Sequence, residues 1–492
     1  MRPLVRMHAT IAAFSVARCQ VGGALLTALD ATRSDSAASV GSARGALVPV
    51  VLIALAALLR VGTFMAFPPE RLVADEIYYA QVARGLALGE GHHYVDDFGV
   101  DLRAWRPPGH PLVLSGLLPA EDAPGVDDRA ASVLPLLGFQ LALGSLLVGA
   151  VWWLGWVCFG PRVALWSGLA AAAYPNLIFF SHTLWSETLT ASLVTCALVG
   201  ALRWSAGPSV RVAVATGLVL GLAALTREVA LGVGAAIGLW WCLEAAPTDR
   251  PRAMRHGLLV LATAFLVVAP WTLRNGRVLG AFVPVSTIGW FAAGEGNTFE
   301  PANWLADRGP MHTVYASRYF GTPGELARAD VARRWTLERI ADSQPDWVLR
   351  KFMREGSLLL SPDSYLRYKI DAGAYGEVGE PLRLALVVLT GGAWFALATL
   401  AVIGIGAAPA SLRHLALCVL SVPVLVHLLT NATSRFRAPW LPLLIVFAGY
   451  AWQQRGGLLE RTPRAARLAS VGVIGFLLLV AWPYYLYFGG RL

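Results

Sequence analysis

Long apolar segments recur along the 492-residue chain, and they restrict its fold more than any other feature of the sequence. A bilayer core holds no water to bind the backbone, so a segment of roughly 20 apolar residues must cross it as a helix. About eleven segments qualify: near residues 46–67, 130–157, 163–180, 188–204, 211–226, 229–244, 257–273, 382–407, 412–430, 438–454 and 468–488. With 56% hydrophobic and only 14% charged residues, the chain is predicted to be an all-α polytopic membrane protein.

One pair of these segments has a second interpretation. Only Thr226, Arg227 and Glu228 separate the segments at 211–226 and 229–244, so a single broken or re-entrant segment is an alternative to two spans.

The distribution of charge predicts an orientation, because arginine accumulates in short loops on the cytoplasmic side. Arginines gather at one set of segment ends: Arg162, Arg203, Arg211, Arg250, Arg252, Arg255, Arg413, Arg455, Arg461, Arg464 and Arg467. The opposite loops are acidic and include Asp75 and Glu76. We therefore expect this pair to face outward. The net charge of +9 then reflects topology, and no pattern for binding nucleic acid accompanies it.

Two outward segments are long enough to hold a site. Residues 68–129 contain a helix-like stretch that starts at Asp75, the tract RPPGHP (Arg106–Pro111), and a short apolar piece that suits an interfacial helix. Helix-like runs at 324–340 and 345–360 predict a small outer cap. The chain thus divides into a loose cytosolic arm (1–45), an N-terminal transmembrane module (46–273), the cap (274–381) and C-terminal transmembrane helices (382–492).

Seven motifs follow one another in the order of a known family: ADEIYYAQVARGL, RPPGHPL, HTLWSETL, GLAALTRE, APWTLRNGRVLGAFVPVS, GEGN and SRFRAPWLPLL. Over about residues 46–455 the chain resembles the bacterial glycosyltransferases of family 39. These GT-C enzymes are related to the dolichyl-phosphate-mannose protein mannosyltransferases and to the aminoarabinose transferases of lipid A. The resemblance implies transfer of a single sugar from a polyprenyl-phosphate carrier to an envelope lipid, polysaccharide or protein, with inversion at the anomeric carbon.

Asp75 is the first candidate for catalysis. Transfer to a hydroxyl needs a base, and a partly desolvated carboxylate at a membrane edge can have its pKa raised toward that role. The resemblance also places catalysis on the Asp of the first outer loop. The structural alternative is a carboxylate that stabilises the start of a helix. Glu76 is a second catalytic candidate, although on a helix it points about 100° away, and Tyr79 shares the face of Asp75 as a substrate contact or a packing residue.

Binding of the carrier phosphate requires positive charge that is in place before negative charge builds on the leaving oxygen. The resemblance places a basic residue beside this phosphate at Arg106, and His110 lies in the same tract. Arg274, Arg435 and Arg437 emerge at the same outer level and are further candidates. Contact with lipid headgroups is the alternative for each arginine.

Three charges lie deeper or in very short loops. Glu187 is costly to bury unless paired, which favours a role in the site. Arg60 lies about 10 Å below the outer end of the first span, where it contacts the carrier phosphate or makes a structural pair. Arg227 and Glu228 are expected to pair with one another.

No metal site is predicted. His92 and His93 stand beside Asp96 and Asp97, but adjacent histidines in a polar loop rarely form a site. No cofactor is assigned, and a divalent cation remains open. A lipid-linked saccharide transporter or flippase and an O-antigen ligase-like enzyme are the alternative functions. A transporter would show internal repeats, which are absent from the sequence.

Overall fold

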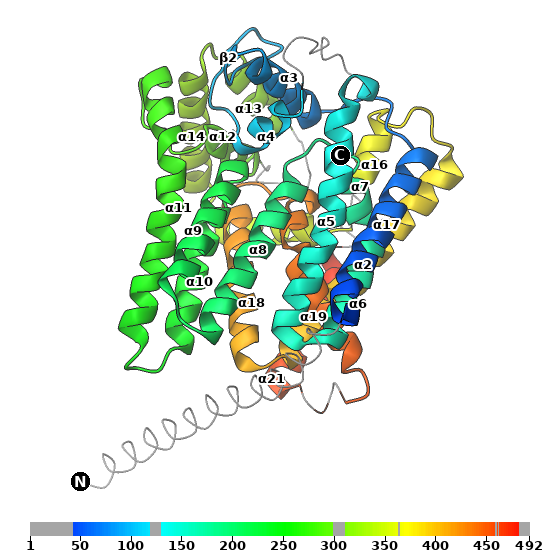
Figure 1. The fold of residues 1–492 in the computed structure, drawn as a ribbon. Helices are drawn as coiled ribbons and strands as arrows, with labels where there is room; N and C mark the ends of the chain where they lie inside the picture. Colours follow the sequence, from blue (N-terminus) through cyan, green and yellow to red (C-terminus); the bar gives the residue numbers. More distant parts are fainter. Residues whose placement is uncertain are drawn as a thin grey trace, which may run out of the picture.

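The chain forms a helical bundle with a two-stranded hairpin at one end, as the computed structural model shows (Figure 1). The structure describes residues 43–118, 129–298, 310–362, 365–457, 460 and 462–481. Nearly all of the predicted N-terminal arm lies outside these residues. We call the end with the short helices the capped end. It holds α3 (Asp75–Ala87), α4 (Gly109–Ser115), α12 (Ile288–Glu295), α13 (Pro310–Phe320) and α14 (Glu325–Asp342).

Within the described ranges, seven helical segments are long and apolar enough to cross a membrane. They are α2 (Ala43–Ala66), η1 (Ala130–Val133) with α5 (Leu134–Phe159), α8 (Glu187–Ala206), α11 (Arg250–Leu279), α17 (Glu380–Ala407), α18 (Ala410–Leu429), and α21 (Arg464–Phe476) with η3 (Leu477–Ala481). Each occupies one of the predicted apolar segments. The prediction of a multi-pass all-helical membrane protein is therefore confirmed, with seven full-length helices rather than eleven among the residues described.

The other four predicted spans form shorter apolar helices. Helices α9 (Val210–Thr226) and α10 (Ala230–Glu244) are separate and pack against each other, so the chain has two helices here and not one broken segment. At 1.5 Å per residue they are about 25 Å and about 22 Å long. Both also pack on α11, so the longer helix flanks them (Figure 1).

A proline shortens the third predicted span. Helix α6 (Pro161–Ala173) stops before Tyr174, which has an extended backbone, and α7 (Pro175–Phe180) begins at Pro175. The residue before a proline is disfavoured in the helical region, which accounts for the break. The tenth predicted span is likewise divided into η2 (Ser434–Trp440) and α19 (Leu441–Gln453). The loop 181–186, which follows α7, and most of η2 are buried.

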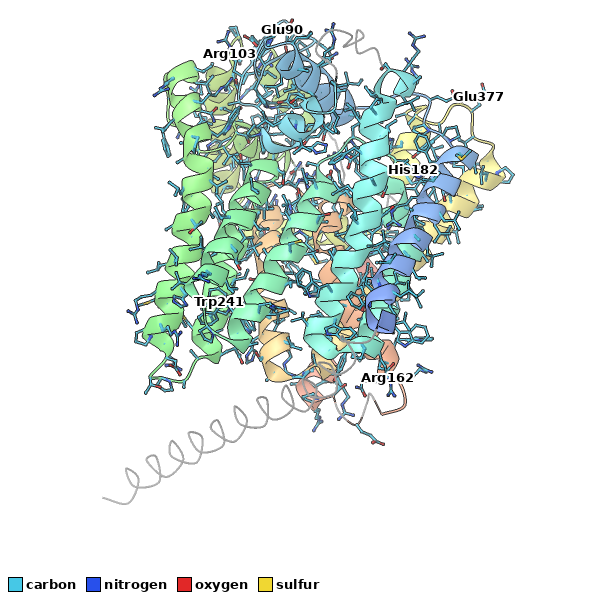
Figure 2. All side chains as sticks on the ribbon, viewed as in Figure 1. Glu90, Arg103, Arg162, His182, Trp241 and Glu377 are labelled. Carbon is cyan, nitrogen blue, oxygen red and sulfur yellow. The ribbon has the colours of Figure 1, made fainter. Side chains whose placement is uncertain are left out.

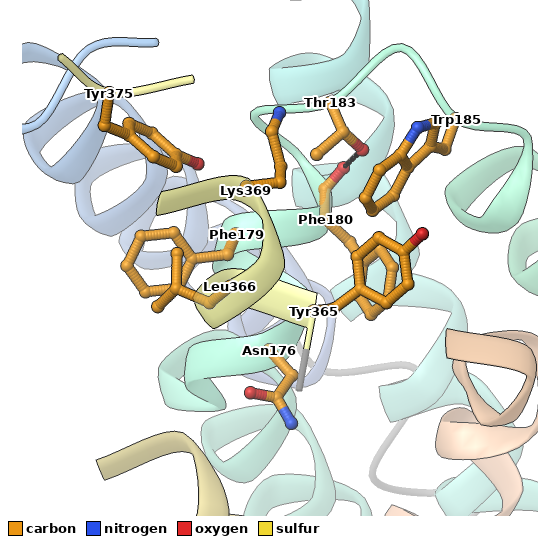
Figure 3. Close-up of a pocket in the computed structure, with 9 residues that line it drawn as sticks. All are labelled: Asn176, Phe179, Phe180, Thr183, Trp185, Tyr365, Leu366, Lys369 and Tyr375. Atoms are coloured by element: carbon orange, nitrogen blue, oxygen red, sulfur yellow. Dashed lines mark hydrogen bonds between the residues drawn. The ribbon is translucent and has the colours of Figure 1, made fainter. Parts of the chain in front are cut away.

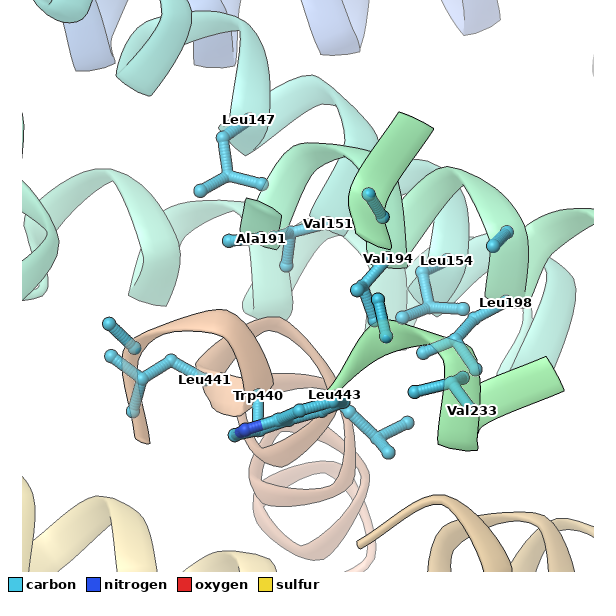
Figure 4. Packing of buried hydrophobic residues seen from close by; sticks show 14 of the residues in the cluster. Leu147, Val151, Leu154, Ala191, Val194, Leu198, Val233, Trp440, Leu441 and Leu443 are labelled. Atoms are coloured by element: carbon cyan, nitrogen blue, oxygen red, sulfur yellow. The ribbon is translucent and has the colours of Figure 1, made fainter. Parts of the chain in front are cut away.

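Aliphatic side chains fill the centre of the bundle. Val151 and Leu154 of α5, Val194 of α8, Val233 of α10 and Trp440 of η2 belong to one buried cluster (Figure 4). Small residues allow helices to approach closely where lipid supplies no hydrophobic drive for association. Gly238 of α10 faces Gly257 of α11, and a Cβ on either glycine would meet the other backbone at 3.2 Å or 2.9 Å.

The first loop is fastened to α14 and α11. Its hairpin pairs β1 (Tyr94–Val95) with β2 (Asp101–Leu102) in antiparallel register. The Glu325 carboxylate accepts hydrogen bonds from the backbone N–H groups of Arg103 (2.6 Å) and Ala104 (3.1 Å). Arg328 binds Asp96 of the hairpin. Arg103 lies at the capped end and Arg162 at the opposite end (Figure 2).

Helix α15 (Trp347–Leu360) buries charged side chains and exposes apolar ones. Its Lys351 and Glu355 are buried, whereas Val348, Leu349 and Phe352 are 66%, 63% and 49% exposed. Helices α14 and α15 occupy the two runs that the sequence predicts to be helical, and α16 (Tyr365–Asp371) follows them. Helix α15 packs on α18, η2 and η3, so its exposed apolar face adjoins membrane-spanning helices.

Candidate active site

Asp75 opens α3 at the boundary between the capped end and the bundle. Two acidic residues in the first turn and Arg84 in the last turn complement the dipole of this helix. Ala74, immediately before it, has a φ of 50°. This left-handed conformation is costly for a residue with a Cβ atom, so surrounding contacts must hold the turn.

Two arginines from distant segments hold the Asp75 carboxylate. Arg106 Nη2 donates to Oδ1 over 2.6 Å, and Arg435 Nη1 donates to Oδ2 over 2.6 Å. Arg106 comes from the proline-rich tract before α4, and Arg435 comes from η2. The Asp75 side chain keeps 19% of its surface exposed, whereas that of Arg435 keeps 6%.

Glu187 holds Arg435 from the other side. Arg435 donates through Nε to one oxygen of Glu187 and through Nη2 to the other over 3.2 Å. Glu187 is fully buried at the first residue of α8, where the helix dipole favours a negative charge. Arg227 adds a further cation, with Nη2 at 3.4 Å from Oε1 of Glu187. Asp75 and Glu187 therefore share Arg435 as a common partner.

The cluster of Asp75, Glu187, Arg106, Arg227 and Arg435 has an excess of positive charge. Three guanidinium groups face two carboxylates within the described part of the chain. In a partly buried setting this excess favours an additional anion, because the effective dielectric constant is lower than in water. Arg106 also has a buried Nε that finds no hydrogen-bond partner among the described residues. The arrangement is suited to bind a singly charged anion next to Asp75.

Aromatic rings orient these guanidinium groups. Arg435 lies 4.2 Å from the Trp185 ring centre, and its Nη1 donates to the Tyr365 hydroxyl over 3.3 Å. Arg106 lies 4.6 Å from the ring centre of Trp105. Cations over ring faces gain electrostatic stabilisation and lose rotational freedom. The arginines are therefore held in place before any ligand arrives.

The pKa of Asp75 is lowered to about 2. Burial raises it, but the charges of Arg106 and Arg435 and the hydrogen bond from Arg435 outweigh burial. The sequence-based expectation of a raised pKa is thus wrong, because desolvation was considered without the two cations. At neutral pH the Asp75 carboxyl group is ionised, which is the form a general base requires.

A pocket adjoins the cluster between α7 and α16 (Figure 3). It is lined by Asn176, Phe179, Phe180, Thr183, Trp185, Tyr365, Leu366, Lys369 and Tyr375. Trp185 and Tyr365 belong to both places, since they line the pocket and contact Arg435. The pocket and the charged cluster therefore share a wall of two aromatic side chains.

Glu76, the next residue of α3, has a set of partners different from that of Asp75. Its Oε1 accepts from Lys369 Nζ (3.0 Å) and from the Leu184 N–H (3.1 Å), and its Oε2 accepts from the Val73 N–H (3.1 Å). Glu76 is fully buried. It ties α3 to α16 and to the loop 181–186, and its predicted catalytic role stays a prediction.

Tyr79 and His110 pack together behind the cluster. Their rings meet edge to face at 4.9 Å, and both side chains are buried. Tyr79 donates to Ser186 Oγ over 3.4 Å, and His110 Nε2 donates to the Leu184 carbonyl over 2.8 Å. Burial lowers the pKa of His110 to about 4, so its imidazole is neutral at pH 7. Both residues support the loop that leads to Glu187.

The other three predicted arginines bind backbone carbonyl groups away from Asp75. Arg274 donates to the carbonyls of Arg103 and His92, over 2.7 Å and 3.0 Å. The acceptors are Leu359 and Ser361 for Arg437, and Ala56, Ala171 and Ala172 for Arg60. These contacts join segments of the fold, and none of them involves Asp75 or Glu187.

The histidines of the first loop point to separate partners. His92 Nδ1 binds the Arg103 carbonyl, and His93 Nδ1 binds Asp101. Asp96 is engaged by Arg328. Among the residues that the structure describes, no three His, Cys, Asp or Glu side chains form a group suited to a metal ion.

Sequence reasoning missed Arg227, Trp185 and Tyr365 as members of the site. The predicted pair of Arg227 with Glu228 is wrong, because Arg227 reaches Glu187 and Glu228 accepts a hydrogen bond from Ser286. The HTLWSETL motif contains Trp185 and was a usable signal. No motif marks Tyr365, whose helix α16 packs on α17.

Comparisons of structure find similar proteins where comparisons of sequence find none. No family model matches the chain, and no curated protein does. The oligosaccharyltransferase AglB from Archaeoglobus fulgidus, in complex with an inhibitory peptide and a dolichol-phosphate, matches with a TM-score of 0.50 at 13% identity, over 90% of this chain and 56% of that one. ArnT from Cupriavidus metallidurans bound to undecaprenyl phosphate matches with a TM-score of 0.41 at 16% identity, over 88% of this chain and 80% of that one.

The Pmt1–Pmt2 protein O-mannosyltransferase complex of S. cerevisiae, bound to the sugar donor, has a TM-score of 0.40 at 17% identity, over 48% of this chain and 34% of that one. The match to AglB indicates a shared GT-C-like fold. The chain spans about half the length of the archaeal oligosaccharyltransferase, 52% and 56% in two of its structures.

Proposed function

We propose that the chain is a membrane glycosyltransferase of family 39 in the GT-C class. It transfers one sugar from a polyprenyl-phosphate carrier to a hydroxyl group at the outer face of a bacterial inner membrane. The observation that carries this proposal is the Asp75 carboxylate held between Arg106 and Arg435 in a cluster with excess positive charge. The motif order and the fold shared with AglB, whose structure contains a dolichol-phosphate, support it.

The charge of the donor suits the cluster. A sugar linked to a polyprenyl phosphate is a phosphodiester with one negative charge, and the departing polyprenyl phosphate gains a second. Arg106 and Arg435 bind the phosphate oxygens and stabilise this developing charge, as fixed donors do in a site that excludes water. Glu187 keeps Arg435 in place as the charge changes.

The reaction is a single displacement. The acceptor oxygen forms a bond to the anomeric carbon while the bond from that carbon to the phosphate oxygen breaks, and its electron pair leaves with the phosphate. Asp75 takes the proton of the acceptor hydroxyl. In the free protein both Asp75 oxygens accept from guanidinium groups. A bound phosphate competes for the same donors, which frees one carboxylate oxygen for the acceptor.

The test uses purified protein in lipid nanodiscs with a panel of polyprenyl-phosphate sugars and envelope-derived acceptors. Release of polyprenyl phosphate and formation of the sugar conjugate are followed by mass spectrometry. We expect transfer with at least one donor, and its loss in Asp75→Asn. Asp371→Asn is a matched control, since Asp371 is a carboxylate paired with Arg383 outside the cluster. Full transfer by Asp75→Asn would contradict the assigned base.

A further inference from the structure

The GEGN motif marks a buried junction outside the arginine cluster. Gly296, at the end of α12, directs its carbonyl oxygen to Lys351 Nζ of α15 over 2.6 Å. The same Nζ donates to the carbonyl oxygen of Thr430 over 2.6 Å. Lys351 is only 2% exposed. One buried ammonium group therefore joins α12 and α15 to the backbone segment that leads into η2.

Glu355 completes this junction one turn along α15. Its Oε2 accepts the N–H of Ala432 over 2.6 Å, and its Oε1 lies 3.3 Å from Lys351 Nζ and 3.2 Å from Arg354 Nη1. Glu355 is 1% exposed. Both backbone contacts fall on the segment 430–432, which comes three to five residues before Arg435.

The junction depends on close approach at Gly296. A Cβ atom at this position would lie 1.7 Å from the Thr430 carbonyl oxygen, so any other residue would push α12 and the segment 430–432 apart. Glu295 of the same motif accepts a hydrogen bond from Asn431 Nδ2 over 3.1 Å. The motif is therefore explained by its contact with this segment.

Helix α15 also holds the chain after Arg435. Arg437 donates to the carbonyl groups of Leu359 and Ser361 at the end of α15, and its guanidinium lies 3.7 Å from the Trp394 ring centre. The backbone on both sides of Arg435 is thus fastened to one helix. A buried ion pair gives little net stability in general, whereas the contacts of Lys351 and Glu355 fix the position of the segment 430–432.

We propose that Lys351 and Glu355 are positioning residues, which set the place of Arg435 against Asp75 by holding the segment 430–432 on α15. This inference deepens the proposed function and rests on it. Its consequence is that the charges of Lys351 and Glu355 affect anion binding through the position of the backbone before Arg435, without contacting the donor.

A double-mutant cycle in nanodiscs tests the inference with undecaprenyl phosphate as the probe. Affinity is measured by native mass spectrometry for the wild type, Glu355→Gln, Arg435→Lys and the double variant. We expect Glu355→Gln to weaken binding about tenfold in the wild type and less than about twofold in the Arg435→Lys background, because residues that act through one group are not additive. A merely structural role would lower affinity by equal factors in both backgrounds, and that result overturns the inference.

A matched control comes from the opposite end of the bundle. Trp204→Phe removes the hydrogen bond from Trp204 Nε1 to His256 (2.7 Å), a buried contact remote from η2. Trp204→Phe alone should have the affinity of the wild type, and Trp204→Phe combined with Arg435→Lys should have the affinity of Arg435→Lys. Asn431→Ala, which removes the contact with Glu295, replaces Glu355→Gln in the cycle if the latter does not fold.

The outcomes separate the two proposals. If the wild-type protein does not bind undecaprenyl phosphate, the proposed function falls and this inference with it. If the wild type binds and Glu355→Gln binds equally well, only the inference falls.

Discussion

Asp75 and Glu76 are neighbours in the sequence, and both pair with cations brought from distant segments, yet their surroundings differ in kind. Glu76 is fully buried, its partners include two backbone N–H groups, and the single charge of Lys369 balances it. Asp75 keeps 19% exposure, and two arginine side chains hold it. A balanced carboxylate with backbone partners has no capacity for a ligand. Where cations are in excess over the carboxylates that they hold, those cations can bind an additional anion.

The largest effect should follow from removing the Asp75 charge. Asp75→Asn retains the size of the side chain but cannot take a proton, so we expect transfer to fall about 10³-fold, within the usual range for loss of a general base. Initial rates with a reactive donor measure this. If Asp75→Asn keeps more than a tenth of the wild-type rate, the difference between the two carboxylates is not catalytic.

A smaller loss should follow from Arg435→Lys. Arg435 donates hydrogen bonds to Asp75 and Glu187 at once, and a lysine side chain cannot provide the same planar set of donors. We expect kcat to fall about 100-fold, in the range found when one donor to a developing oxyanion is removed. Arg383→Lys, in a partly exposed pair with Asp371 outside the cluster, is the control and should keep its rate. An unchanged kcat in Arg435→Lys would remove this residue from transition-state binding.

Glu76 should respond in stability rather than in rate. Glu76→Gln leaves the buried Lys369 without a counter-charge, which costs about 3 kcal/mol. The midpoint of thermal unfolding in detergent should drop, while the folded fraction keeps most of its transfer activity. Adding Lys369→Met removes the orphaned charge and should restore much of the midpoint. If the double variant is no more stable than Glu76→Gln, the ion pair does not explain the burial of Glu76.

The smallest expected effect concerns pH. Because the pKa of Asp75 in the free protein is lowered to about 2, the carboxylate stays ionised down to about pH 4, and kcat/KM should show no acid limb from it between about pH 5 and pH 8. Removing a cation raises this pKa, so Arg106→Gln should lose rate as pH falls from about 5 to about 4. Rate profiles of the two proteins with the same donor measure the shift. Coincident profiles would contradict the influence of Arg106 on Asp75.

Sequence reasoning recovered the local features of the fold. Helix positions follow from apolar runs, which are properties of consecutive residues. The length of a helix was harder to predict, since Pro175 divides one apolar run into α6 and α7. Sequence reasoning also selected Asp75, Arg106, Glu187 and Arg435, four of the five side chains that form the cluster, because motif order and segment ends mark them.

Pairing between distant segments was beyond reach from sequence. Arg227 stands beside Glu228 in the chain but reaches Glu187 across the bundle. The pKa of Asp75 depends on two guanidinium groups at 2.6 Å, and no sequence pattern gives such distances. Arg60, Arg274 and Arg437 were candidates as well, yet each binds backbone carbonyls, a choice that only packing decides.

Helix α15 turns its charges inward and its Val348, Leu349 and Phe352 outward. Such a helix suits the boundary between headgroups and acyl chains. The lateral pressure of the surrounding lipids then acts on the same element that fastens the backbone on both sides of Arg435. If the proposed transfer takes place, we expect its rate to vary with lipid headgroup and chain length at constant donor concentration, so that the membrane regulates the protein as well as surrounding it.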